Sequence, residues 1–152
     1  MTINTFWQEF LAAKNPDPST QYYSSFHFCN DEKLANELLA LVLSGKKTAT
    51  ASSLPCYEIE GEKLPQVGNY SIVTDFSGNP HCVIETTAVT IMRFGDMTYD
   101  ICKREGEDDT LESWREGHIK YFSQEAAELG FEFSEDMPIV FEDFTVVYKR
   151  HN

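Results

Sequence analysis

The amino-acid sequence predicts one α+β domain, in which a mostly antiparallel sheet curls into a barrel and helices flank it. Three observations lead to this prediction. The chain has 152 residues, of which 41% are hydrophobic and 13% aromatic, enough for one hydrophobic core. Its centre is rich in β-branched and aromatic residues, with turn signals between them. Helical periodicity is found on both sides of that centre.

Two helices are expected before the β-rich centre. The first covers Asn4–Lys14, with Asn4 as its cap, and "NPDPST" ends it. The second begins after Asn30 or Asp31 and runs to Ser44, where Gly45 is typical of a helix end. Its apolar stripe is predicted to comprise Leu34, Leu38, Leu41 and Val42.

The centre predicts strands. "TATAS" alternates small and polar residues, and "NYSIVTD" and "HCVIETTAVTIMRF" have strand composition. The turn signal "FSGNP" separates the last two, so a hairpin is expected, and "LPQVGNY" before it reads as a loop.

The last third of the chain predicts helices and then a strand. "DMTYDICKREG" indicates a short helix ended by Gly106, and Thr110 is expected to cap a long helix through Leu129 that Gly130 closes. "PIVFEDFTVVYKR" predicts a C-terminal strand or strand pair. The apolar side of the long helix is predicted to comprise Leu111, Trp114, His118, Phe122, Ala126 and Leu129.

The charge balance constrains the partner. The chain carries 25 acidic and 12 basic residues, a formal net charge of -13. Such a chain repels an extended nucleic-acid backbone, which favours a small nucleoside-like ligand or a short single-stranded RNA held at a local basic spot. No apolar run reaches the ~20 residues of a membrane span, and no secretory signal is visible, so we expect a cytoplasmic protein without membrane contact.

The four cysteines do not indicate a metal or a cofactor. Cys29, Cys56, Cys82 and Cys102 are widely spaced, without a C-x-x-C pair or a Cys/His cluster of zinc spacing. We therefore expect free thiols and neither metal nor cofactor.

The stretch "GKKTAT" follows the second predicted helix and places two lysines at its exit. Together with the downstream "CKREGEDDTLESWREGHIKYF", it resembles the ASCH family of small β-barrels, which is related to the PUA RNA-binding fold. The family motif is G-x-K-x-x-[T/E], and Gly45, Lys47 and Thr50 match it. The longer branch of the family is similar in the second segment, at Glu105, Gly106, Trp114, His118 and Phe122. The resemblance implies a single domain over 1–152, with an ASCH core at about 31–148 and helix 4–14 as an extension.

The resemblance also implies functions. ASCH members are proposed to bind RNA, a short member removes the acyl group from N4-acetylcytidine through a lysine, a threonine and a glutamate, and a longer member is described as a ribonuclease. Carried over, these catalytic residues are Lys47, Thr50 and Glu105. Several members place an arginine where this chain has Ser52, and Arg104 is a candidate replacement.

The chemistry of these three side chains is compatible with amide hydrolysis, although each also has a structural interpretation. A lysine in a dry barrel mouth can act as base or nucleophile, yet Lys46 and Lys47 also suit a helix C-terminus. Thr50 can also be a β-favouring strand residue without a catalytic role, and Glu105 can also be a solvated charge at the end of a helix. If Glu105 lies near Lys47, it can transfer protons as a general acid–base.

Further residues are expected to line the substrate site. They are Gly45, Lys46, Thr48, Ser52, Tyr57, Arg104, Trp114 and His118. Three hypotheses follow: a hydrolase of a modified nucleoside, an RNA-binding module or metal-independent ribonuclease, and a non-catalytic ligand-binding domain. The acidic composition favours the first, because a neutral nucleoside does not need a basic surface.

Overall fold

Five strands form one curled sheet in the computed structural model, which describes residues 1–14 and 16–150. The strand order is β1-β3-β4-β5-β2, and every neighbouring pair is antiparallel except β1 with β3. The edge strands β1 and β2 do not pair with each other, so the sheet is an open half-barrel. The predicted α+β class and the curled, mostly antiparallel sheet are confirmed. The strands are β1 Ser24–Phe26, β2 Ala49–Ser53, β3 Tyr70–Thr74, β4 Pro80–Arg93 and β5 Pro138–Lys149.

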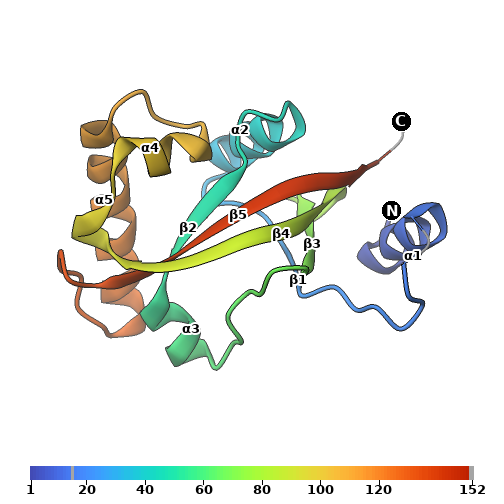
Figure 1. The fold of residues 1–152 in the computed structure, drawn as a ribbon, viewed down its shortest axis with the longest axis horizontal. Coiled ribbons are helices and arrows are strands. Elements are labelled where there is room, and N and C mark those ends of the chain that lie inside the picture. Colours follow the sequence, from blue (N-terminus) through green and yellow to red (C-terminus); the bar gives the residue numbers. More distant parts are fainter. Residues whose placement is uncertain (15, 151–152) are drawn as a thin grey trace.

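Helices lie around this sheet (Figure 1). The long strands β4 and β5 cross the molecule, with α4 and α5 near one end and α1 near the other. The helices are α1 Ile3–Lys14, α2 Glu32–Leu43, α3 Leu54–Glu60, α4 Tyr99–Cys102 and α5 Leu111–Leu129, with short 3-10 turns η1 Phe94–Asp96 and η2 Lys103–Glu105.

The β3–β4 hairpin, predicted from "FSGNP", is confirmed and carries a helix on each face. Ile72 and Val83 pair across the strands and pack with α1. Val73 and Cys82, the next pair, point to the other face and pack with α2. Because side chains alternate along a strand, the hairpin contributes side chains to two apolar clusters, one on each face.

The long helix α5 begins and ends where the sequence predicts. Thr110 Oγ1 accepts a hydrogen bond of 3.1 Å from Ser113 N, and Gly130 closes the helix with φ +84°. Its Trp114 and Phe122 are fully buried against Phe94 and β5. This cluster places α5 beside β2, which positions the candidate site.

Several predicted details are wrong. Helix α1 starts at Ile3 and not at the predicted Asn4. The side chain that accepts from an amide of the first turn is Thr2 Oγ1, and the donor is the amide of Thr5. Leu34 of the predicted stripe of α2 is 39% exposed. Of the two predicted caps of α2, Asn30 and Asp31, the structure confirms Asp31.

Two elements were not predicted. Helix α3 follows β2 directly, with Pro55 in its first turn. The three-residue strand β1 falls within "QYYSSFHF". The C-terminal run forms the single strand β5.

None of the helices in residues 1–14 and 16–150 is both long and apolar enough to cross a membrane.

Candidate functional site

Two segments far apart in the sequence dock where α2 ends. The amide and hydroxyl of Thr48 both donate to the carbonyl oxygen of Arg104, at 2.9 and 3.2 Å. Gly106 has φ +72°, and a Cβ there would lie 2.4 Å from the carbonyl oxygen of Lys46. Glycine is therefore required at 106 for its backbone conformation and for the close approach.

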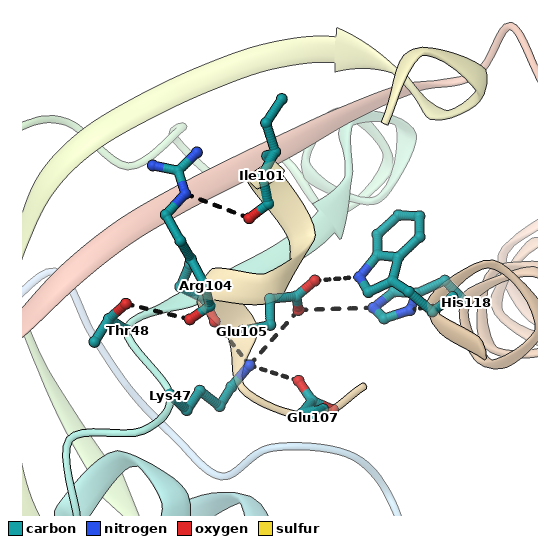
Figure 2. A network of polar contacts seen from close by, with 9 residues as sticks. Lys47, Thr48, Ile101, Arg104, Glu105, Glu107 and His118 are labelled. Atoms are coloured by element: carbon teal, nitrogen blue, oxygen red, sulfur yellow. Dashed lines mark hydrogen bonds and ion pairs between the residues drawn. The ribbon is translucent and has the colours of Figure 1, made fainter. Parts of the chain in front are cut away.

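Lys47 is buried where these segments meet, with 1% of its side chain exposed (Figure 2). Its Nζ donates to the carbonyl oxygen of Ala49 at 2.7 Å and to Glu107 Oε2 at 2.7 Å, and lies 3.6 Å from Glu105 Oε1. Two hydrogen-bond acceptors and one further carboxylate in ion-pair contact thus surround the ammonium group. The structure thus brings Lys47 and Glu105 together, with Glu107 as a second carboxylate.

Glu105 is held from several sides. Its side chain is 2% exposed, Oε2 accepts from Trp114 Nε1, and Oε1 lies 3.7 Å from His118 Nε2. Burial alone would raise the pKa of Glu105, but His118, Lys47 and Trp114 outweigh it and hold the pKa below its usual value. Glu105 is therefore an ionised carboxylate whose oxygens are already engaged.

His118 supports Glu105 from α5. Its Nδ1–H donates to the carbonyl oxygen of Trp114 at 2.8 Å, and its ring stacks on the Trp114 ring with centroids 4.1 Å apart. Burial works to lower the pKa of His118, but Glu105 outweighs it, and the pKa is raised. His118 is therefore a positive partner of Glu105 when protonated, and part of its ring reaches the cleft described next.

A cleft of about 1300 Å³ lies beside this network, between β1 and α2 on one side and β2 and α5 on the other. Lys47, Glu105 and His118 line it, and so do Thr50 and Ser52 of β2. Acidic side chains predominate over lysines. Among the described residues the cleft is lined by Asp31, Glu37, Glu62, Glu105, Glu107, Asp108, Glu125, Glu128 and Glu142, but only by Lys47, Lys63 and Lys120.

Of the other predicted binding residues, some line the cleft and others lie outside it. Tyr57 lines the cleft together with Ser52. Gly45 and Thr48 line a separate groove of about 680 Å³ along β5. Lys46 is exposed and Lys47 buried, so the two lysines have different environments.

The structure argues against a ligand contact for two of the predicted residues. The Arg104 guanidinium points away from Lys47 (Figure 2). It pairs with Asp143 at 2.8 Å. It also lies over the Phe141 ring, outside the described lining of the cleft. The Trp114 ring is completely buried between Phe94 and His118, so neither of its faces can receive a nucleobase.

Sequence reasoning missed two carboxyl groups. Glu107 was not predicted as a site residue, but Gly106 turns the chain so that the Glu107 side chain meets Lys47. Glu142 lies opposite Thr50 in the β2–β5 register and lines the cleft. The alternation of β5 predicts a face for Glu142 but not its partner strand.

Within residues 1–14 and 16–150, no three His, Cys, Asp or Glu side chains are arranged to hold a metal ion. The four cysteines are free thiols, and only Cys29 lines the cleft.

The half-barrel, its flanking helices and the buried lysine at the exit of α2 define a PUA-like domain. The chain belongs to the ASCH domain family, whose model matches residues 24–148. No curated protein matches the chain.

Solved structures agree with this assignment. An ASCH domain from Lactobacillus crispatus JV V101 is 38% identical with a TM-score of 0.88, over 95% of this chain and 93% of that one. A protein from Enterococcus faecalis V583, of the family model DUF984, is 36% identical with a TM-score of 0.88, over 97% and 88%. A hypothetical protein at 11% identity and a TM-score of 0.51, over 82% and 96%, shares the fold alone.

Proposed function

We propose that this protein is a hydrolase that removes the acyl group from a modified nucleoside of the N4-acylcytidine type. The observation that carries the proposal is the buried Lys47 ammonium, held between Glu105 and Glu107 at the wall of a cleft that Thr50 also lines. A buried charge network beside an open cleft is typical of a functional site.

The reaction needs one proton transfer. A water oxygen adds to the acyl carbon, the bond between that carbon and N4 breaks, and a water proton moves to N4, which leaves a carboxylic acid and cytidine. Glu107 is the carboxylate better placed to carry this proton, because its side chain is 21% exposed against 2% for Glu105. Glu105 then positions Lys47, and the Thr50 hydroxyl can donate to the developing oxyanion.

The charge of the cleft favours a nucleoside over RNA. Nine acidic side chains against three lysines would repel a phosphate backbone, whereas an uncharged nucleoside meets no such penalty. RNA binding would require a continuous basic surface along the cleft, and the described residues that line the cleft do not form one.

The test is deacylation of N4-acetylcytidine by the purified protein, followed by chromatography of cytidine. Lys47→Met and Thr50→Val should each lower kcat/KM at least 100-fold, whereas Lys46→Met, which changes the exposed neighbouring lysine, should retain it. Single-stranded RNA is incubated in parallel with the same variants. Cleavage of RNA that depends on Lys47, with N4-acetylcytidine left intact, would refute the proposal and establish the ribonuclease alternative.

A further inference from the structure

Glu142 is a second carboxyl group in the cleft, remote from the lysine network in sequence. It pairs with Thr50 across β5 and β2, and both residues line the cleft. Directly opposed residues of an antiparallel pair have Cβ atoms about 4.5–5.5 Å apart on one face of the sheet. Glu142 and Thr50 are therefore adjacent within the substrate-sized space.

The environment of Glu142 differs from that of Glu105. Glu142 Oε2 accepts a hydrogen bond of 2.6 Å from Thr86 Oγ1. Within residues 1–14 and 16–150, no Lys, Arg or His side chain lies within ion-pair distance of this carboxyl group. Burial raises the pKa of Glu142, and the Thr86 hydroxyl offsets this only in part. These surroundings disfavour the charged form of Glu142, in contrast to those of Glu105.

Hydroxyl groups complete this part of the cleft. Glu142 contributes to the raised pKa of both Tyr23 and Tyr57, after burial, which places the two phenols near it. Ser52 also lines this part of the cleft, and the Tyr23 hydroxyl donates to the carbonyl oxygen of Lys63. Hydroxyl groups and a further carboxyl group, that of Glu62, thus line the cleft around Glu142, with no cation in ion-pair contact among the described residues, and this suits an uncharged polar ligand.

A neutral carboxyl group matches one edge of a cytosine ring. It offers an O–H donor on one oxygen and an acceptor on the other. An N4-acylcytosine offers the N3 acceptor and the N4–H donor side by side. Oε1–H can donate to N3 while Oε2, which accepts once from Thr86, has a second lone pair for N4–H. The two bonds would form one planar pair.

We propose that Glu142 is the substrate-binding residue that recognises the N3 and N4–H edge of the cytosine ring and thereby directs the acyl group towards Thr50. This inference rests on the proposed function for the identity of the ligand. It adds a residue on β5 to a site otherwise built from the α2–β2 and η2–α5 segments, and it explains why a carboxyl group without a cationic partner lies opposite Thr50.

The test compares three variants. Glu142→Gln retains one donor and one acceptor in the same shape, so KM for N4-acetylcytidine and Kd for cytidine should stay within about threefold of the unmodified protein. Glu142→Leu removes both groups, and KM and Kd should rise at least tenfold. Asp143→Asn is the matched control, because Asp143 is the next residue of β5 and points to the other face, towards Arg104. Thermal unfolding checks that all three fold.

The outcomes separate this inference from the proposed function. Cytidine binding that weakens in Glu142→Leu but not in Glu142→Gln supports the inference, even if N4-acetylcytidine is not hydrolysed. Hydrolysis with an unchanged KM in Glu142→Leu overturns the inference and leaves the proposed function intact. Equal weakening in Glu142→Gln and Glu142→Leu also overturns it, because the ionised carboxylate would then be the binding group. An absence of binding of both compounds to the unmodified protein overturns it as well.

Discussion

Replacing Lys47 by methionine should destabilise the protein much more than any surface lysine change. The Nζ of Lys47 lies 3.6 Å from Glu105 Oε1, and the two side chains are 1% and 2% exposed. At an effective dielectric constant of about 20, two unit charges at this separation attract by about 5 kcal/mol. Removal of one partner from a buried pair typically costs about 3–5 kcal/mol, because the other charge remains buried. For a domain of this size the melting temperature should fall by roughly 6–20 °C.

The assay is urea or thermal unfolding of Lys47→Met, Lys46→Met and the double variant Lys47→Met with Glu105→Gln. Lys46→Met should change the free energy of unfolding by less than about 0.5 kcal/mol, since the side chain is exposed. The double variant should regain at least half of the lost stability, because it removes the buried charge that Lys47 balances. All variants without Lys47 should remain inactive. The reasoning fails if Lys47→Met is as stable as Lys46→Met, or if the double variant is no more stable than Lys47→Met.

Three further predictions concern pH, backbone and charge. The pKa of His118 is raised above its ordinary 6.5, so its pairing with Glu105 stabilises the fold below about pH 6.5 and is lost as the pH rises through the folded pKa. The stability gap between the unmodified protein and His118→Gln, measured by urea unfolding, should therefore be larger near pH 6 than near pH 9, and an equal gap would contradict this. Gly106→Ala should lose more stability than Gly130→Ala. Both glycines have positive φ, which costs an alanine about 1–2 kcal/mol, but only at position 106 would the new Cβ collide with backbone atoms. Equal melting temperatures of the two variants would contradict this. The 5′-phosphate of N4-acetylcytidine should be hydrolysed with lower kcat/KM than the nucleoside, and the difference should shrink with added salt; a better rate on the phosphate would refute the charge argument.

The sequence predicted the elements that carry local signals. Helices α2 and α5 have side-chain caps and glycine ends, and both were located within a residue or two. Helix α3 was missed, because seven residues are too few for a clear helical period and Pro55 reads as a loop residue. Strand β1 was missed because three residues carry no alternation, and it exists only through pairing with β3.

The candidate site was predictable only in part, for a related reason. The proximity of Lys47 and Glu105 came from a family motif, and no periodicity of the chain would have given it. Glu107 and Glu142 were missed, because their positions depend on a left-handed turn at Gly106 and on the register of β5 against β2. Both depend on tertiary contacts and not on local sequence.

The cleft places two glutamates in opposite electrostatic surroundings. Glu105 has a cation, an imidazole and an indole N–H around its oxygens, and despite burial its pKa is lowered. Glu142 Oε2 accepts a hydrogen bond from the Thr86 hydroxyl, and burial raises the pKa of Glu142. A pair of carboxyl groups whose environments drive their pKa values apart can divide the work of one reaction, with one group acting as a charge and the other as a neutral donor. The strand register determines this division, because Thr50 lies beside Glu142 on the sheet and three residues after Lys47 in the chain. A ligand that contacts Thr50 would therefore lie between a carboxyl group with a lowered pKa and one with a raised pKa.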